Sequence, residues 1–300
     1  MKIRLENVDF SSNSGPNNFG KKLWTFLSTR GHIIENEIPD VQLSFIETRN
    51  TFKKTLLRLD GIYFSTRGNW KKQNYFIEKS YNESAGVIIQ SEFDYNLITS
   101  YFGFRENIKI IRNGTPLHIM DQIKADKLPL NSSGKIWLSA SSWRPHKRLK
   151  ENIRIFNEFS SEGDTMLIAG KNPDVDIAGL NNKSIIYLGN LSWIDLVSIM
   201  KVSDNFIHAA WLDHCPNVVV DAKAAGCKLY CASAGGTSEL ATKNDVIFLE
   251  NDWDYKPIDL YDPPTLDLSL KIPGNYNGDY SMGQIGLDYE NALLDIGSNP

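Results

Sequence analysis

The stretch Asp213–Glu239, DHCPNVVVDAKAAGCKLYCASAGGTSE, decides how this chain of 300 residues is interpreted. Asp213 and Asp221 flank a proline and a run of valines, and an alanine-rich segment follows. Pro216 suits the first position of a helix, where its missing N–H is no loss, and Gly226 suits the position just past the end. The stretch therefore predicts a helix that begins between two carboxylates.

The two ends of this stretch are expected to meet at one ligand. The N–H groups at the start of the helix, at Asn217 and Val218, form a site of the kind that attracts phosphate. A short apolar strand follows the helix and leads to Gly235, Gly236 and Glu239. Since that strand runs back toward the start of the helix, we expect these residues to belong to the same site.

Whole-chain composition indicates a globular α/β protein. Hydrophobic residues make up 41% and charged residues 23%, and 300 residues suffice for two domains. No apolar run is long enough to span a membrane, and the first residues lack the apolar core of a signal peptide. The three cysteines, Cys215, Cys227 and Cys231, are expected to be buried thiols rather than metal ligands. We therefore expect a cytoplasmic location.

The net charge of −4 hides a difference between the two halves. Residues 1–128 carry 18 Lys and Arg against 14 Asp and Glu, a balance of +4, and residues 129–300 carry 14 against 22, a balance of −8. A basic first half could meet an anionic acceptor or make peripheral contact with a membrane, although ordinary solvated surface charge explains it as well. No motif indicates nucleic-acid binding.

Strand patterns alternate with helical patterns along most of the chain. This alternation predicts a mostly parallel sheet in each of two Rossmann-like, doubly wound domains. Expected strands are residues 2–8, 41–47, 58–64, 85–90, 107–111, 136–140, 165–169, 184–188 and 205–209. Expected helices are residues 19–29, 70–81, 91–102, 149–159, 192–202 and 281–296. We place the N-terminal domain at 1–128, with 115–133 as a linker, the C-terminal domain at 129–278, and at 279–300 a helix that packs back on the first domain.

Several candidate site residues lie where strands are expected to end or break. Gly15 lies in the loop after the first strand, and Gly170 and Gly189 follow two later strands, where a nucleotide could approach the backbone. Asp60 with Arg58 interrupts an apolar run, which suggests either an acceptor contact or a buried structural carboxylate. Both interpretations of Asp60 stay open.

These features together resemble the GT-B glycosyltransferases, most closely the retaining family 4 group. That family carries a Glu-x7-Glu motif, which resembles Asp213-x7-Asp221 here, and its GG..E pattern resembles Gly235 to Glu239. Ser91–Gly103 and Ile110–Gly114 look like the segment that leads out of the family's first domain. The resemblance covers most of residues 1–245 and implies two domains that face each other across a cleft.

The resemblance also implies a reaction. A sugar would move from a nucleotide-diphosphate donor, a UDP- or GDP-sugar, to a hydroxyl of a glycan, lipid or small-molecule acceptor, with retention and with neither metal nor cofactor. Lys147 aligns with the family's phosphate-binding Lys, and Arg144 lies two residues after Ser142, which stands where the family has an Arg. Asp221 would bind the ribose and Asp213 the sugar. Glu239 would either contact the sugar or only cap the short helix in which it lies.

Two departures from the family keep other functions open. Both motif carboxylates are Asp, one methylene shorter than Glu, and none of the five histidines falls where many relatives have a His facing the donor. A non-catalytic sugar-nucleotide or glycan-binding relative would explain both departures. A GT-B sugar-nucleotide epimerase, which needs no acceptor, is the other alternative.

Overall fold

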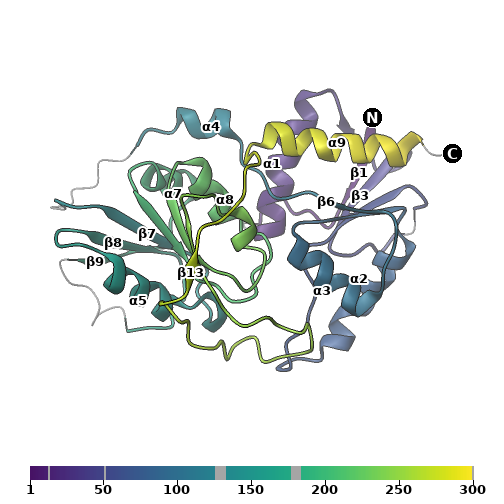
Figure 1. Cartoon of the computed structure of the whole chain (residues 1–300). Coiled ribbons are helices and arrows are strands. Elements are labelled where there is room, and N and C mark those ends of the chain that lie inside the picture. The colour runs from purple at the N-terminus through teal and green to yellow at the C-terminus, as the bar shows by residue number, and fades with distance from the viewer. Residues whose placement is uncertain (13, 51, 126–132, 177–183, 299–300) are drawn as a thin grey trace. The chain divides into compact units, whose positions relative to one another are not determined.

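A computed structural model describes residues 1–12, 14–50, 52–125, 133–176 and 184–298. The chain divides into two compact units (Figure 1). Unit 1 comprises Met1–Pro116, Asp254–Ile258 and Asp279–Pro300, and unit 2 comprises Leu117–Trp253 and Asp259–Gly278. Each unit contains one largely parallel sheet with helices between its strands, which is the doubly wound α/β class that the alternating pattern predicts.

Unit 1 is built on a six-stranded parallel sheet in the order β2-β1-β3-β4-β5-β6. Its strands are β1 (Lys2–Glu6), β2 (Ile33–Ile34), β3 (Val41–Phe45), β4 (Thr55–Arg58), β5 (Gly86–Ile89) and β6 (Ile108–Ile110). Its helices are α1 (Gly15–Thr29), α2 (Trp70–Glu83), α3 (Glu92–Phe102) and α9 (Met282–Ser298).

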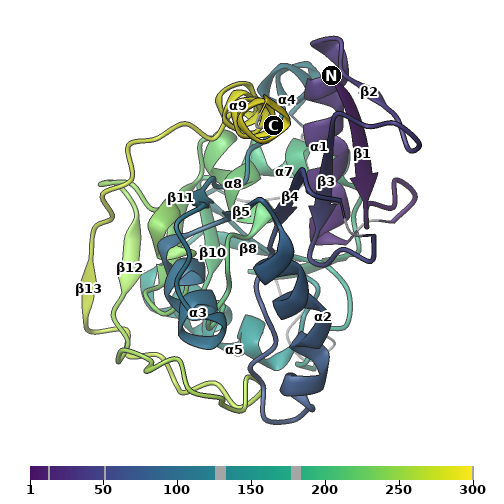
Figure 2. The same ribbon diagram turned by 90° about the vertical axis from the view of Figure 1, so that its right-hand side faces the viewer.

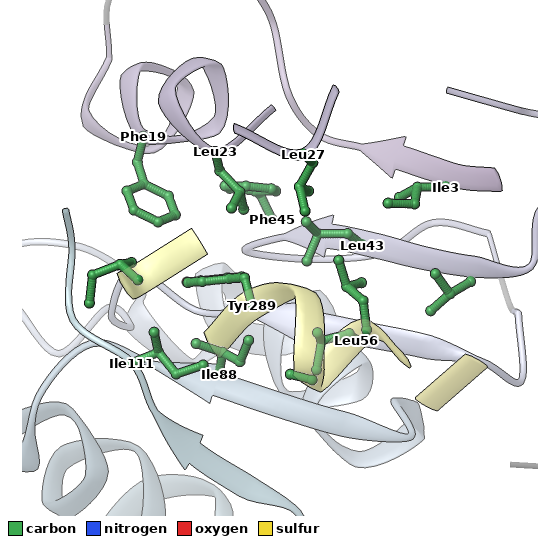
Figure 3. Packing of buried hydrophobic residues seen from close by; sticks show 14 of the residues in the cluster. Ile3, Phe19, Leu23, Leu27, Leu43, Phe45, Leu56, Ile88, Ile111 and Tyr289 are labelled. Carbon is green, nitrogen blue, oxygen red and sulfur yellow. The ribbon is translucent and has the colours of Figure 1, made fainter. Parts of the chain in front are cut away.

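The core of unit 1 joins the beginning and the end of the chain. Helices α1 and α9 lie side by side (Figures 1 and 2) and bury their apolar faces against the sheet in one cluster (Figure 3). Phe19 and Leu23 come from α1, Leu43 from β3, and Tyr289 and Leu293 from α9. Because these side chains are almost fully buried together, α9 is part of the core of unit 1.

Unit 2 is built on a seven-stranded sheet in the order β13-β12-β11-β10-β7-β8-β9, parallel except for the β12–β13 pair. Its strands are β7 (Ile136–Ala140), β8 (Thr165–Ala169), β9 (Ile185–Gly189), β10 (Asn205–His208), β11 (Lys228–Ala232), β12 (Val246–Phe248) and β13 (Lys271–Ile272). Among its described residues the helices are α4 (Leu117–Gln122), α5 (Leu149–Phe159), α7 (Trp193–Met200) and α8 (Asn217–Ala224), and the short 3-10 helices are η1 (Pro145–Lys147) and η2 (Ser238–Leu240).

Local sequence explains where several helices begin. Ser91 and Ser192 cap α3 and α7, and each hydroxyl accepts the N–H of the aspartate three residues on. Helix α5 has a strongly one-sided apolar pattern and buries Leu149, Ile153 and Phe156 against the sheet of unit 2. The predicted bounds of β7, α5 and β8 agree with the structure at both ends.

Three expectations about elements were wrong. The strand expected at residues 58–64 is β4, which lies earlier and ends at Arg58, so Asp60 lies beyond its carboxyl end. The expected linker contains α4, and the carbonyls of Ile123 and Lys124 after it accept hydrogen bonds from Lys201, directly after α7, and from Ser198 within α7. The helix within Asp213–Glu239 begins at Asn217, so Pro216 is its cap and not its first residue. The unit boundary also differs from 128, because Leu117–Gln122 belongs to unit 2.

Candidate active site

Strand order in unit 2 creates a topological switch point between β7 and β10. From β7 the chain continues to β8 and β9 on one side, and from β10 it continues to β11 and β12 on the other. Loops that leave neighbouring strands in opposite directions open a crevice at the carboxyl ends of those strands, where ligands of α/β proteins bind. The loop after β7 carries Lys147, and the loop after β10 carries Asp213.

Lys147, Asp213 and His208 form a bonded cluster at this switch point. Lys147 Nζ lies 2.6 Å from Asp213 Oδ2, and His208 Nε2 lies 2.8 Å from the same oxygen. His208 is the last residue of β10 and is buried, whereas the Lys147 and Asp213 side chains keep 18% and 12% of their surface exposed. The hydrogen bond from His208 fixes the Asp213 carboxylate, and this carboxylate in turn holds Lys147 at the edge of the sheet.

The electrostatics of the cluster favour an ionised Asp213 and a neutral His208. Burial by itself would raise the pKa of Asp213, but Lys147 and the His208 hydrogen bond outweigh it and hold the pKa well below its ordinary value. Burial lowers the pKa of His208 despite the neighbouring carboxylate. A neutral His208 therefore donates from Nε2 to Asp213 and leaves Lys147 as the charged partner.

Backbone pairing fixes the position of Asp213. Leu212, directly before it, has φ +53°, a left-handed conformation that is unfavourable for a bulky residue. Asp213 forms a bridge with Gly235, and its carbonyl accepts the N–H of Gly236 at 2.7 Å. A Cβ on Gly235 would lie 2.7 Å from the Asp213 carbonyl oxygen, and Gly235 has φ +103°. Gly235 and Gly236 thus serve the close backbone approach that holds Asp213.

Arg148 anchors the loop that carries Lys147, and sequence reasoning missed it. Arg148 Nη2 lies 2.6 Å from Glu250 Oε1 and 2.8 Å from the Pro264 carbonyl, and its side chain is buried. Arg148 itself has φ +51° between η1 and α5. Arg144, the predicted second cation of this loop, is exposed.

Helix α8 begins beside Asp213 and carries Asp221 on its buried side. The N–H groups of Asn217 and Val218 lie in its first turn, as predicted, and Pro216 accepts the first helical hydrogen bonds. Asp221 is only 3% exposed, and Trp193 Nε1, in the first turn of α7, donates to its Oδ2 at 2.8 Å. The carboxylate expected to face a ribose is therefore held by an indole that the sequence did not point to.

The other predicted residues of unit 2 lie at the same edge of the sheet, for partly different reasons. Gly170 has φ +119°, and a Cβ there would lie 1.7 Å from the Ser141 carbonyl oxygen, so Gly170 is required by the loop after β7. Its N–H bonds to the Gly189 carbonyl at 2.7 Å. Glu239 lies half-buried in η2.

Asp60 and Arg58 belong to a buried polar network in unit 1. Arg58 is fully buried and forms an ion pair with Asp60, while its other nitrogens donate to Tyr289 Oη at 3.0 Å and Asn113 Oδ1 at 2.8 Å. Gln90 Nε2 also donates to Asp60 Oδ1 at 2.6 Å. These contacts favour the structural interpretation of Asp60 and make Arg58 a core residue.

Gly15, where a nucleotide was expected to approach the backbone, is the first residue of α1, and its neighbours Ser14 and Pro16 line a cavity. The cavity has a volume of about 380 Å³ at the carboxyl ends of β1 and β3, the switch point of this sheet. Asn7 and Ile46 line it and have φ +61° and +70°. The other lining residues are Ser14, Pro16, Asn17, Glu47, Tyr63, Gln73 and Ile77. The lining includes one carboxylate and no cation, so it suits hydroxyl groups better than phosphate.

The described parts of the chain contain no cluster of three or more His, Cys, Asp and Glu side chains arranged to hold a metal ion. Within them, no helix is both long and apolar enough to cross a bilayer. All three cysteines are buried and outside any disulfide, and burial raises the pKa of Cys227 to about 12.

Two parallel-stranded Rossmann-like units define the GT-B fold, which is the class of this chain. No protein-family model matches the sequence, and neither does any curated protein. Solved structures do match. Sucrose-phosphate synthase from Thermosynechococcus elongatus superposes with a TM-score of 0.68 at 13% identity, over 99% of this chain and 97% of that one.

Two other solved structures show the same likeness. Anabaena HepE in complex with UDP and glucose has a TM-score of 0.61 at 15% identity, over 100% of this chain and 93% of that one. A glycosyltransferase involved in Avilamycin A biosynthesis has a TM-score of 0.63 at 11% identity, over 100% and 99%. At these identities the comparisons establish the fold.

Proposed function

We propose that this chain is a glycosyltransferase that moves a sugar from a nucleotide-diphosphate donor to an acceptor hydroxyl. The observation that carries the proposal is the Lys147–Asp213–His208 cluster at the switch point of unit 2, beside the start of α8. The fold supports it, because HepE, which shares the fold, has been crystallised with UDP and with UDP-glucose. A UDP- or GDP-sugar is the proposed donor.

Lys147 has the role of stabilising the leaving diphosphate. Breaking the bond to the sugar places negative charge on the phosphate oxygens, and fixed cations and N–H groups can meet that charge. Lys147 offers a partly exposed ammonium, Arg144 an exposed guanidinium, and Asn217 and Val218 the amides of a helix start. These groups make transfer without a metal ion the proposed route.

Asp213 and Asp221 have the role of orienting the donor. Asp213 positions Lys147 and leaves part of its carboxylate exposed for the sugar, as the family resemblance implies. Asp221 lies one turn into α8, where the resemblance assigns the ribose, and Trp193 fixes the direction of its carboxylate. Glu239 is the proposed further contact to the sugar.

The acceptor is assigned to unit 1, to the cavity beside Gly15 rather than to Asp60, whose contacts favour a structural role. A glycan, a lipid or a small molecule can supply the hydroxyl, and retention of configuration follows from the resemblance to family 4. The cytoplasm is the proposed location, because three buried cysteines outside any disulfide fit a reducing compartment.

Calorimetric titration with UDP and GDP tests the donor site. We expect the wild-type protein to bind one of them and Lys147→Ala to weaken binding about 10- to 150-fold, since a hydrogen bond to a charged group contributes about 1.5–3 kcal/mol. Lys150→Ala is the matched control, because Lys150 is exposed nearby in α5. Absence of binding to every nucleoside diphosphate by the wild-type protein would refute the donor site.

Product analysis separates transfer from its two alternatives. Incubation with a nucleotide-sugar panel and mixed acceptors is expected to release nucleoside diphosphate and to form a product whose anomeric configuration, read by NMR, equals that of the donor. Conversion of the donor to another nucleotide-sugar without an acceptor would indicate an epimerase. Binding without turnover would indicate a non-catalytic relative, and loss of activity in EDTA would contradict the metal-free route.

A further inference from the structure

The outward face of α2 combines exposed aromatic rings with cations. Tyr75 is 62% and Phe76 53% exposed, and their rings make an edge contact with centroids 5.1 Å apart. Lys71, Lys72 and Lys79 on the same helix are also exposed. Across residues 63–83 the chain carries four cations, with Arg67 as the fourth, against two carboxylates, Glu78 and Glu83. We call this face the α2 surface.

The buried side of α2 prevents these rings from turning inward. Asn74, Ile77, Ser80 and Tyr81 face the interior, and Asn74 exchanges two hydrogen bonds with the backbone of Tyr63, at 2.8 and 2.6 Å. Because the helix is held in this orientation, Tyr75 and Phe76 stay at the surface. Large adjacent aromatic residues in solvent usually mark a binding surface.

The lysines of α2 also oppose the preference of their own helix. Lys71 and Lys72 lie in its first turn, which contains no acidic residue, although the helix dipole favours anions there. Local residue choices that conflict with local stability are expected where a surface has another role. Two cations beside two aromatic rings therefore point to an anionic partner with an apolar layer.

Charge distinguishes the α2 surface from an exposed apolar patch around β2 in unit 1. Ile33, Ile34 and Ile38 are exposed around β2, and Ile38 is 73% exposed. Residues 30–40 carry three acids, Glu35, Glu37 and Asp40, against one Arg. An anionic partner would be repelled there and attracted to α2.

We propose that the α2 surface binds the surface of an anionic lipid bilayer, an interaction that lies beyond the proposed transfer reaction. Helices that lie in a membrane interface carry Lys or Arg on the polar side and insert aromatic residues at headgroup depth, and anionic lipids attract the cations. Tyr75 supplies an apolar ring with a polar tip, the arrangement that favours the interface between lipid and water. Phe76 supplies the apolar contact, and Lys71, Lys72 and Lys79 supply the charge.

Vesicle co-sedimentation of the full chain tests this surface. We expect binding to vesicles of phosphatidylcholine with added phosphatidylserine, little binding to phosphatidylcholine alone, and weaker binding at high salt. The double variant Lys72→Gln/Lys79→Gln should weaken binding about 25-fold, since each lysine near an anionic surface contributes about fivefold. Tyr75→Ser/Phe76→Ser should weaken it roughly tenfold or more.

Ile33→Ser/Ile38→Ser is the matched control, because it removes two exposed apolar side chains from the acidic patch and should leave vesicle binding unchanged. A thermal unfolding midpoint equal to that of the wild-type protein would show that each variant is folded. The proposal would be overturned if the wild-type protein did not bind anionic vesicles, or if the α2 variants bound them as well as the wild type does. Either result would favour a protein partner for the α2 surface. Neither result depends on nucleotide binding, so failure here leaves the donor site separately testable.

Discussion

Trp193 shows how one residue distinguishes a binding role from a structural one. Its indole N–H donates to Asp221, whose carboxylate is almost fully buried between α7 and α8. Trp193→Phe keeps an aromatic ring and removes the indole N–H that donates to Asp221. We expect it to lower the free energy of unfolding by about 1–3 kcal/mol, because a charged acceptor loses a buried donor.

The same variant should raise the KM for the donor about five- to tenfold and leave kcat within about twofold, because donor orientation depends on Asp221. Steady-state kinetics check this, with the exposed neighbour Ile194→Ala as the control. A loss of stability with an unchanged KM would make Asp221 a structural carboxylate.

His146 gives the protein a pH-dependent stability. Burial, with Lys147 nearby, lowers the pKa of His146 to about 3, whereas the unfolded chain protonates it near 6.5. Between these values only the unfolded state takes up the proton, so the free energy of unfolding falls as the pH falls from 6.5. The loss due to this residue between pH 7.5 and pH 5 should be about 2 kcal/mol.

His146→Phe should remove that part of the pH dependence. His146 Nδ1 is buried and has no hydrogen-bond partner among the described residues, and its ring packs on Tyr261, so a phenyl ring fits without orphaning a polar group. Urea unfolding at several pH values measures the difference. If the free energy of unfolding of the variant depended on pH between 7.5 and 5 as that of the wild-type protein does, His146 would not be the group responsible. His208, whose pKa is also lowered by burial, would then be the next candidate.

Sequence reasoning reached the residues of linear motifs and missed their partners. Lys147 was predicted from the family resemblance and Asp213 from the proline and valines that follow it, and the structure brings their side chains within 2.6 Å. His208 lies five residues before Asp213, and the loop between them, which includes the left-handed Leu212, folds back so that the two side chains meet. The contacts of Arg148 with Glu250 and Pro264 join residues about a hundred positions apart, so no local pattern indicates them.

At the scale of elements, the loop between β7 and η1 depends on one glycine. Gly170→Ala would place a Cβ 1.7 Å from the Ser141 carbonyl oxygen at φ +119°. We expect it to cost more than about 4 kcal/mol, a large part of the stability of a domain. Gly189→Ala is the control, because φ is +73° there but nothing lies within 4 Å, so the cost should be about 1–2 kcal/mol. Soluble yield and urea unfolding of the two variants compare them, and equal effects would contradict the steric argument.

Long periodic elements followed from the sequence, and short ones did not. Helix α5 and strands β7 and β8 have clear apolar patterns and matched their expected bounds. Strands β2 and β13 contain two residues each, too few for any pattern to form, and only pairing with a neighbour defines them. The run at 58–64 was apolar enough to suggest a strand, but Gly61, with φ +113°, turns the chain just after β4. The alternation of strand and helix patterns thus predicts the layers of each unit, whereas the short strands at the sheet edges are defined only by their pairing with a neighbouring strand.

At the scale of the whole molecule, the chain ends in the unit where it begins. Helix α9 supplies Tyr289, whose hydroxyl accepts from the buried Arg58, and Glu290, which binds His32 at 2.7 Å and Arg30 at 2.6 Å. The last residues thereby complete both the apolar cluster and the polar network of unit 1. The expected helix at 281–296 had the right type and nearly the right bounds, but its partners lie more than two hundred residues away and leave no mark on the local sequence.

Adjacent leucines of α9 allow this dependence to be measured. Leu293 is fully buried in the cluster of unit 1, whereas Leu294 is 45% exposed. Leu293→Ala should lower the free energy of unfolding by about 2–5 kcal/mol, because it removes buried methyl groups and leaves a cavity. Leu294→Ala should change it by no more than about 0.5 kcal/mol.

Hydrogen exchange locates the effect of these variants within the chain. Leu293→Ala should accelerate exchange in β1 and β3, which share the cluster, and leave exchange in β7 and β8 of unit 2 unchanged. Equal effects of the two variants, or faster exchange confined to unit 2, would show that α9 does not stabilise unit 1.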